Sequence, residues 1–318
     1  MEIFKQISQK LSLAKSIAIL THINEDPDTL GSCFAMAATL RSMGKDAVIY
    51  VSGKIEKRLE FMGHDYVIYT PGDTPEHDLC LCIDCGDIGR ISERKAIFDS
   101  VGTTINIDHH YSNTRFADVN YIDGDASSAG ELVYRFLKSE GICITEYIAN
   151  QLYTAICSDT GSFKYSNTSP QTMLAAGELL GFGIDNAEIS RLLFDCESES
   201  DALLKAEVTQ NMESFCGGKI RLVTMPKKLY EKYGMSAEDA PNLVDIPRKI
   251  ENTEIAVCLK EQEDGIRVNL RSNGSCDVSA VAAALGGGGH KKAAGCRMEM
   301  TSMEKVKERI VKECAYLI

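Results

Sequence analysis

Aspartate and histidine side chains gather in four short segments of the sequence, each where a predicted strand or helix ends. The segments are residues 21–28, 84–87, 108–110 and 158–161. Three of the six histidines of the chain, His22, His109 and His110, lie in these segments. Carboxylates and imidazoles are the groups that bind divalent cations and transfer protons near neutral pH.

The carboxylates of these segments, Asp26, Asp28, Asp84 and Asp159, cannot all ionise side by side without a counter-charge. Imidazole and carboxylate ligands without a thiolate suit Mn²⁺ or Mg²⁺ better than structural zinc. Two such ions about 3.5–4 Å apart clamp an in-line phosphoryl displacement and activate a bridging water. Each segment alone also fits a structural role, such as a helix cap for Asp28. Their occurrence together favours a metal site.

The elements that must position these segments alternate between strand and helix. Short apolar strands are predicted at residues 16–20, 47–51, 79–83 and 104–107, and helices at 30–43, 128–139, 146–157 and 171–180. A capping box, Ser128-x-x-Glu131, begins the second of these helices. Continuous apolar strands separated by helices predict an α/β domain with a mostly parallel sheet covered on both faces. Ligands bind beyond the carboxyl ends of such strands, so we expect the four segments to converge there.

A second, smaller α/β domain is predicted over residues 202–318, after a first domain at 1–185 and an acidic linker at 186–201. It carries a run of four glycines that ends at Gly289 and is followed by His290 and two lysines. Successive glycine N–H groups can bind an anion. Arg271 and Ser272, at the end of a predicted strand, add a guanidinium suited to phosphate. A simple helix stop explains one glycine but not four, whereas for Arg267 a solvated strand face remains an equal alternative.

Composition limits the partners. The 318 residues carry 34 basic and 46 acidic side chains, a net charge of −12, which disfavours extended binding of duplex DNA. No apolar run approaches the roughly 18 residues that a membrane span needs, and the N-terminus lacks the apolar stretch of a signal peptide. We therefore expect a cytoplasmic protein without membrane contact. Its 12 cysteines are expected to be free, and the Cys82-x-x-Cys85 pair to be structural rather than a zinc site.

The Asp108-His109-His110 triplet, taken with the other three segments, resembles the DHH phosphoesterase superfamily, and the glycine-histidine element resembles its DHHA1 domain. Length and layout resemble the group of bifunctional oligoribonucleases and pAp phosphatases (NrnA-type). The resemblance implies hydrolysis of short oligoribonucleotides (nanoRNA) or of 3′-phosphoadenosine 5′-phosphate by water activated between two metal ions. It implies short single-stranded RNA or small nucleotides as partners, and a homodimer. A phosphodiesterase for cyclic or linear dinucleotides is the nearest alternative, and a non-catalytic nucleotide sensor is a more distant one.

The resemblance also implies a role for each matching residue. One Mn²⁺, with Mg²⁺ as the alternative, would be bound by His22, Asp26 and Asp84, and a second by Asp28, Asp84, His109 and Asp159. Asp84 would bridge the two ions, and Asp108 would orient His109. His110 would contact the scissile phosphate or assist the leaving oxygen. The substrate would be held by residues of the second domain, namely Arg271, Ser272, Gly287, Gly288, Gly289 and His290. Two positions depart from the family pattern: Glu25 stands where Pro is usual, adding charge at the rim, and Thr29 stands where Ala is usual.

Overall fold

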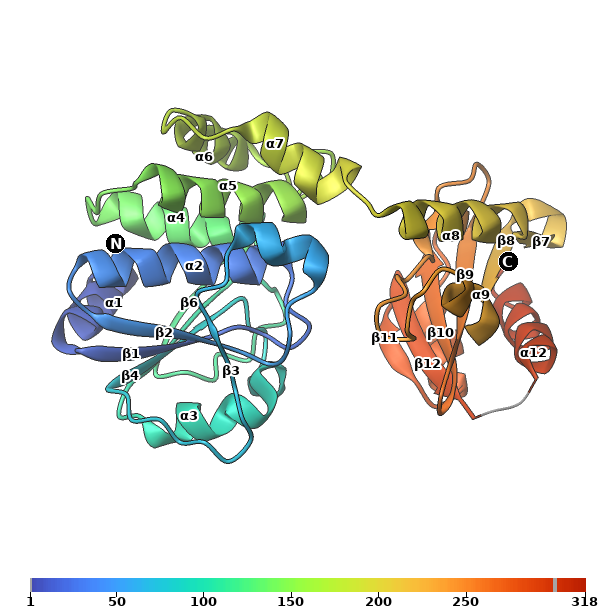
Figure 1. Cartoon of the computed structure of the whole chain (residues 1–318), viewed down its shortest axis with the longest axis horizontal. Coiled ribbons are helices and arrows are strands. Elements are labelled where there is room, and N and C mark those ends of the chain that lie inside the picture. Colours follow the sequence, from blue (N-terminus) through green and yellow to red (C-terminus); the bar gives the residue numbers. More distant parts are fainter. Residues whose placement is uncertain (1, 300–301) are drawn as a thin grey trace. The chain divides into compact units, whose positions relative to one another are not determined.

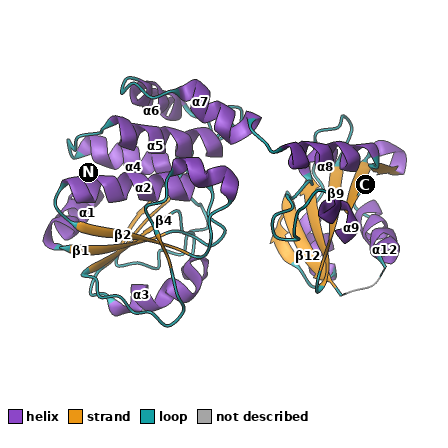
Figure 2. Ribbon diagram, in the orientation of Figure 1, coloured by secondary structure: helices purple, strands orange, loops and turns teal. Residues whose placement is uncertain are grey.

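The computed structural model describes residues 2–299 and 302–318 (Figure 1). The chain divides into two compact units, the first ending at Cys196 and the second beginning at Glu197. Each unit has its own sheet and its own helices (Figure 2). The α/β fold class expected from the sequence is confirmed, with a parallel sheet in the first unit and a mixed sheet in the second. None of the helices in the described part of the chain has the length and apolar character that crossing a bilayer requires.

The sheet of the first unit consists of parallel strands in the order β3-β2-β1-β4-β5-β6. Their bounds are β1 Ser16–Leu20, β2 Asp46–Val51, β3 Val67–Ile68, β4 Leu79–Ile83, β5 Thr104–Asp108 and β6 Val119–Ile122. The strand order changes direction between β1 and β4. In parallel α/β sheets such a switch point leaves a crevice at the carboxyl ends of the strands, and ligands bind in it.

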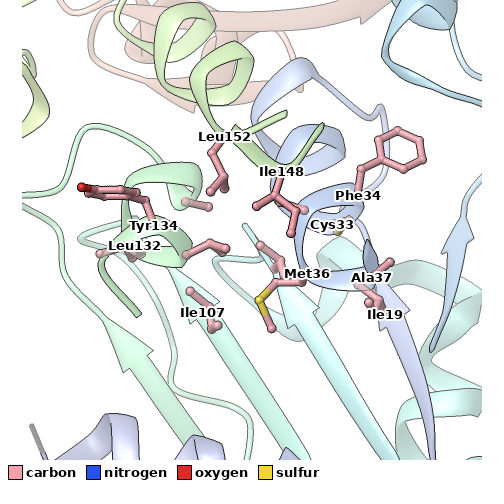
Figure 3. Close-up of a cluster of buried hydrophobic side chains, with 14 of the residues drawn as sticks. Ile19, Cys33, Phe34, Met36, Ala37, Ile107, Leu132, Tyr134, Ile148 and Leu152 are labelled. Carbon is pink, nitrogen blue, oxygen red and sulfur yellow. The ribbon is translucent and has the colours of Figure 1, made fainter. Parts of the chain in front are cut away.

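Helices cover both faces of this sheet, which explains why its central strands β1 and β4 are almost entirely apolar. They are α1 Glu2–Leu13, α2 Pro27–Ser42, α3 Lys95–Ser100, α4 Ala129–Ser139 and α5 Glu146–Asp159, with short 3₁₀ helices at Lys57–Met62 and Ile88–Arg94. Ile17 and Ile19 of β1 belong to the core under α2, α4 and α5, part of which is drawn in Figure 3. Ala18 and Leu20 belong to the opposite core, which also contains Ile97 of α3.

The predicted linker at residues 186–201 is largely helical in the structure. After α6 (Pro170–Leu180), the chain forms α7 (Asn186–Ser190) and a π-helical turn (Arg191–Asp195), and Ile189 packs into the core of the first unit. The helix expected to begin near residue 202 begins earlier, at Glu199. The division between the two units, after Cys196, falls within this predicted linker.

The second unit has a mixed sheet in the order β11-β12-β10-β9-β8-β7. Its strands are β7 Glu213–Phe215, β8 Ile220–Met225, β9 Ile255–Gln262, β10 Gly265–Ser272, β11 Gly288–His290 and β12 Ala293–Met298. Its helices are α8 Glu199–Gln210, α9 Lys227–Lys232, α10 Asp245–Arg248, α11 Val278–Ala284 and α12 Met303–Ala315, with a 3₁₀ turn at Cys216–Gly218. Side chains from α11 and α12 share one core with the sheet, and side chains from α8 and α9 share a second.

Candidate metal centre

The carboxyl ends of β1, β4 and β5 and the ends of two helices bring the acidic and imidazole side chains to one place. Asp84 directly follows β4, and its φ of 63° turns the chain sharply after the strand. His22 lies two residues after β1, and His109 directly follows β5. Asp28 lies in the first turn of α2 and Asp159 is the last residue of α5. Segments far apart in sequence thus meet beside the switch point of the sheet.

Asp84 lies at the middle of this arrangement, with its two carboxylate oxygens directed at different imidazoles. Its Oδ2 is 3.3 Å from Nε2 of His22, and its Oδ1 is 3.4 Å from Nε2 of His109. The Asp84 side chain is 3% exposed, so both oxygens are withdrawn from bulk water. A carboxylate in this position can offer one oxygen to each of two neighbouring cations.

Two groups of ligands extend away from Asp84. Asp26 Oδ2 is 3.4 Å from His22 Nε2, which makes His22, Asp26 and Asp84 one group. His109 Nε2 is 3.7 Å from Asp28 Oδ2 and 3.5 Å from Asp159 Oδ2, which makes a second group. The six side chains expected from the sequence to bind metal therefore lie together. The structure also groups His110 with Asp84 and His109.

Asp28 is fixed by the N-terminus of α4 rather than acting as a helix cap. Its Oδ2 accepts a hydrogen bond from the N–H of Ala129 at 2.7 Å and its Oδ1 accepts one from Gly130 at 2.9 Å. The cap of α2 is Asp26, whose Oδ1 accepts hydrogen bonds from the N–H groups of Asp28 and Thr29. The positive end of the α4 dipole favours a carboxylate at this buried position. A completely buried Asp28 is thereby held with one edge toward His109.

The orientation of His22 follows from a backbone contact. Its Nδ1 lies 2.8 Å from the carbonyl oxygen of Ile23, so Nδ1 carries the proton and Nε2 is left to face Asp26 and Asp84. A metal-binding histidine requires this arrangement, because the second ring nitrogen must donate elsewhere while the first binds the ion.

The charges of the site perturb its pKa values strongly. Burial lowers the pKa of His22, but Asp26 and Asp84 outweigh burial and raise it to about 11. His109 follows the same pattern: burial opposes the effect of Asp84, Asp28 and Asp159, and the pKa rises to about 10. Burial raises the pKa of Asp159 to about 7 and, with the charge of Asp84, raises that of Asp28 well above its usual value. The carboxylates of the cluster are therefore stabilised by positive charge, which bound protons provide in the absence of a cation.

These residues fit a pair of divalent cations on independent grounds. Asp84 Oδ1 is buried and has no hydrogen-bond partner among the described residues, as expected of an oxygen reserved for a metal ligand bond. Neighbouring ligands of an octahedral ion with bonds of about 2.0–2.1 Å lie about 3 Å apart, close to the separations seen here. The donors are oxygens and imidazole nitrogens, since Cys82 and Cys85 are turned into the core. This donor set suits Mn²⁺ or Mg²⁺.

Asp108 corrects one expectation from the sequence. It was expected to orient His109, but its Oδ1 lies 2.7 Å from Nδ1 of His110. Its Oδ2 accepts a hydrogen bond from Asn113 Nδ2 at 2.5 Å. The Asp108 side chain is fully buried, whereas that of His110 is 45% exposed. Asp108 therefore holds the imidazole of His110 from its buried side, and the opposite edge of the ring faces solvent. The hydrogen bond to Asp108 raises the pKa of His110 above its usual value.

Glu25 was expected to add negative charge at the rim of the site, but the structure buries it instead. Its side chain is 7% exposed and accepts hydrogen bonds from Thr21 Oγ1 and from the N–H and hydroxyl of Ser52. The guanidinium of Arg94, itself 1% exposed, lies 3.8 Å from Glu25 and donates to Thr21 Oγ1 at 2.6 Å and to the carbonyl of Tyr50 at 2.8 Å. Arg94 and Glu25 thus fix the segment that carries His22 and Asp26. No pattern in the sequence indicates this role for Arg94, which lies some 70 positions along the chain from Glu25.

Three of the six residues expected to bind substrate in the second unit line one cavity. A cavity of about 450 Å³ is lined by Arg271, Gly288, Gly289 and also Arg267, so Arg267 faces the same space as Arg271. His290 is exposed, and Ser272 is buried with its hydroxyl lacking a partner among the described residues. Of the four glycines, Gly288 and Gly289 lie in the strand β11 and Gly286 and Gly287 precede it; anion binding by their N–H groups stays a prediction.

Packing alone accounts for two of these glycines. A Cβ on Gly287 would lie 2.3 Å from the carbonyl oxygen of Gly295, and one on Gly289, where φ is 142°, would lie 2.5 Å from Cα of Ala294. Close pairing of β11 with β12 therefore requires glycine at both positions. The cavity beside Arg271 is the stronger indication of ligand binding in this unit.

Comparison with known proteins agrees with this geometry. The model of the DHH family, N-terminal domain, matches residues 16–158, and the model of the DHHA1 domain matches residues 223–316. The bifunctional oligoribonuclease and PAP phosphatase NrnA of Thermus thermophilus is 30% identical over 93% of this chain and 88% of that protein. Its namesake from Bacillus subtilis is 29% identical over 91% of each chain.

A solved structure shares the whole fold. An exopolyphosphatase-related protein from Bacteroides fragilis is 28% identical, covers 99% of this chain and 97% of its own, and gives a TM-score of 0.91. The resemblance inferred from the Asp-His-His triplet and the glycine-histidine element is thereby confirmed. The chain belongs to the DHH family and joins its N-terminal domain to a DHHA1 domain.

Proposed function

We propose that the protein is a metal-dependent phosphoric ester hydrolase that acts on short oligoribonucleotides and on 3′-phosphoadenosine 5′-phosphate. The relatives that match nearly the whole chain are named for these two activities. The observation that carries the proposal is the position of Asp84, whose two oxygens face His22 and His109 in two adjoining groups of ligands.

The two groups of ligands that share Asp84 would hold two divalent cations. We propose Mn²⁺, with Mg²⁺ as the alternative. Bound there, they would supply a metal-activated water as the nucleophile and neutralise charge on the phosphoryl oxygens. His22, Asp26 and Asp84 would bind one ion, and Asp28, Asp84, His109 and Asp159 the other. The α4 N-terminus and the carbonyl of Ile23 orient Asp28 and His22 for this task.

His110 has the properties of a proton donor to the leaving oxygen. Its Nδ1 is engaged by buried Asp108, which leaves Nε2 at the exposed edge of the ring. Asp108 raises the pKa of His110, which favours the protonated imidazole, and that form can donate a proton as the P–O bond breaks. Asp108 thus acts on catalysis through His110.

Arg271 and the cavity beside it are proposed to bind a phosphate or nucleotide end. The guanidinium donates only to the carbonyl of Leu270, at 3.3 Å, among the described residues, so most of its donors are available to an anion. A fixed guanidinium can bind phosphate through two parallel hydrogen bonds, which a lysine cannot do.

The direct test is hydrolysis by the purified protein with Mn²⁺ of a diribonucleotide, 3′-phosphoadenosine 5′-phosphate and a cyclic dinucleotide, with Asp84→Asn as the inactive variant. Turnover of the first two, lost in Asp84→Asn, supports the proposal. Arg271→Lys tests the proposed phosphate contact in the second unit and should raise KM with little change in kcat. Turnover of the cyclic dinucleotide alone, or full activity of Asp84→Asn, would overturn the proposal.

A further inference from the structure

Tyr111, which directly follows His110, is a large aromatic side chain left almost entirely in solvent. It is 82% exposed, the highest value among the large hydrophobic side chains of the described residues. Burying an aromatic ring contributes more to stability than burying most other side chains. Tyr111 makes no such contribution, so its place beside the metal centre has no explanation in the packing of the core.

The ring is nevertheless held in position. Its hydroxyl donates a hydrogen bond to Asp125. A Cβ on Gly124 would lie 2.5, 2.6 and 2.8 Å from three adjacent ring atoms, and such similar short distances place the ring face over the backbone of Gly124. One face of the ring therefore rests on a glycine, while the other is open to solvent. A side chain fixed in advance loses little conformational entropy when a ligand binds to it.

The charges around the ring favour a neutral, flat ligand over a phosphate. Asp125 accepts from the tyrosine hydroxyl, and Asp123 lies in the same turn and accepts from the N–H of Asp125. Arg135 is already paired with Asp123 at 2.9 Å. Anions are repelled by this turn, whereas a nucleobase carries no charge and stacks on aromatic rings whatever its sequence.

We propose that the open face of Tyr111 is a stacking site for a nucleobase of the substrate, next to the phosphate at the metal centre. The inference rests on the proposed function, because it assumes a nucleotide substrate. Tyr111 is then a substrate-binding residue that favours nucleotides over other phosphoesters. Loss of one base stack corresponds to roughly a tenfold loss of affinity.

Steady-state kinetics with two substrates test the proposal. One is diadenylate, and the other is the same phosphodiester of two riboses without bases. Tyr111→Leu should raise KM for diadenylate about tenfold and leave KM for the base-free substrate and kcat for both unchanged. Tyr111→Phe should stay near the wild type, because it retains the ring. An unchanged KM in Tyr111→Leu, or an equal loss of kcat on both substrates, would overturn the proposal. Failure of the wild type to cleave diadenylate would instead refute the proposed function.

Direct binding gives a second, independent readout, because the chain contains no tryptophan. In Tyr111→Trp the indole is the sole tryptophan, and AMP added in the presence of Mg²⁺ should quench its fluorescence in a saturable way. Ribose 5-phosphate, which has the same phosphate and no base, should not. Tyr316→Trp is the matched control, since Tyr316 is 73% exposed at the end of α12. Equal responses of Tyr111→Trp to both ligands, or of both variants to AMP, would contradict stacking at Tyr111.

Discussion

Gly31 sets the spacing between the two helices that carry Asp28 and Asp159. A Cβ at this position would lie 2.5 Å from the backbone carbonyl oxygen of Gln151 in α5 and 3.2 Å from Cβ of Ala155. Carbon and carbonyl oxygen normally approach to about 3.3–3.6 Å. Gly31→Ala must therefore push α2 away from α5 by a substantial part of an ångström, because neither contact is with a flexible side chain.

The expected size of the effect follows from two opposing contributions. Overpacking of a close interface costs about 1–3 kcal/mol, while alanine gains about 1 kcal/mol over glycine within a helix. Gly177→Ala in α6 isolates the second contribution, since a Cβ there meets no atom within 4 Å. Urea unfolding of the first unit should show Gly177→Ala more stable than the wild type and Gly31→Ala less stable than Gly177→Ala by about 1–3 kcal/mol.

The same pair of variants separates packing from metal binding. Because Gly31→Ala moves Asp28 relative to Asp159, Mn²⁺ binding by calorimetry should weaken about tenfold or more, as for other changes that disturb ligand orientation. Gly177→Ala should bind Mn²⁺ as the wild type does. Equal stability and equal Mn²⁺ affinity of the two variants would refute the claim that Gly31 sets this spacing.

Three further perturbations have defined outcomes. The buried carboxylate of Glu131 accepts hydrogen bonds from Ser127 and Thr172, which with Arg135 outweigh burial and lower its pKa below 4.5. The ionised carboxylate therefore stabilises the fold above about pH 4.5, and this stabilisation is lost as the pH falls. The free energy of unfolding in urea should be lower for Glu131→Gln than for the wild type, with the largest difference at pH 7 and a smaller one toward pH 4. A difference that does not change with pH would contradict this. Arg94→Met leaves Glu25 buried without its cation and should cost roughly 3–5 kcal/mol of unfolding free energy and weaken Mn²⁺ binding, whereas a change below 1 kcal/mol would exclude a fixing role. Removing metal with EDTA should lower the melting temperature by roughly 5–10 °C relative to Mn²⁺ at about 100 times its Kd, and Asp84→Asn should abolish the difference; an undiminished difference in that variant would place the stabilising ion elsewhere.

Much of the fold could be predicted because its strands carry strong local signals. The run at residues 16–20 is apolar at both alternating positions, and only a strand covered on both faces requires that. The rule that ligands bind at the carboxyl ends of parallel strands then predicts that His22, Asp84 and His109 lie together. The segments that were missed carry weaker signals. The two-residue strand β3 is exposed, and β11 consists of two glycines and a histidine.

Details of the site depended on side-chain direction, which the sequence does not contain. Asp108 and His109 are neighbours in sequence, but the chain leaves β5 at Asp108 and places the ring of His110, not that of His109, against the Asp108 carboxylate. Glu25 lies among ligands in sequence and was expected at the rim. Arg94 draws it inward from a distant segment, and no local pattern predicts that contact.

The number and positions of the bound cations test the central claim most directly. Anomalous diffraction from crystals grown with Mn²⁺ should show two peaks that share Asp84, one beside His22 Nε2 and the other beside His109 Nε2. In Asp84→Asn crystals both peaks should weaken together, because each ion loses a ligand. A single peak, or two peaks of which neither touches Asp84, would contradict the account.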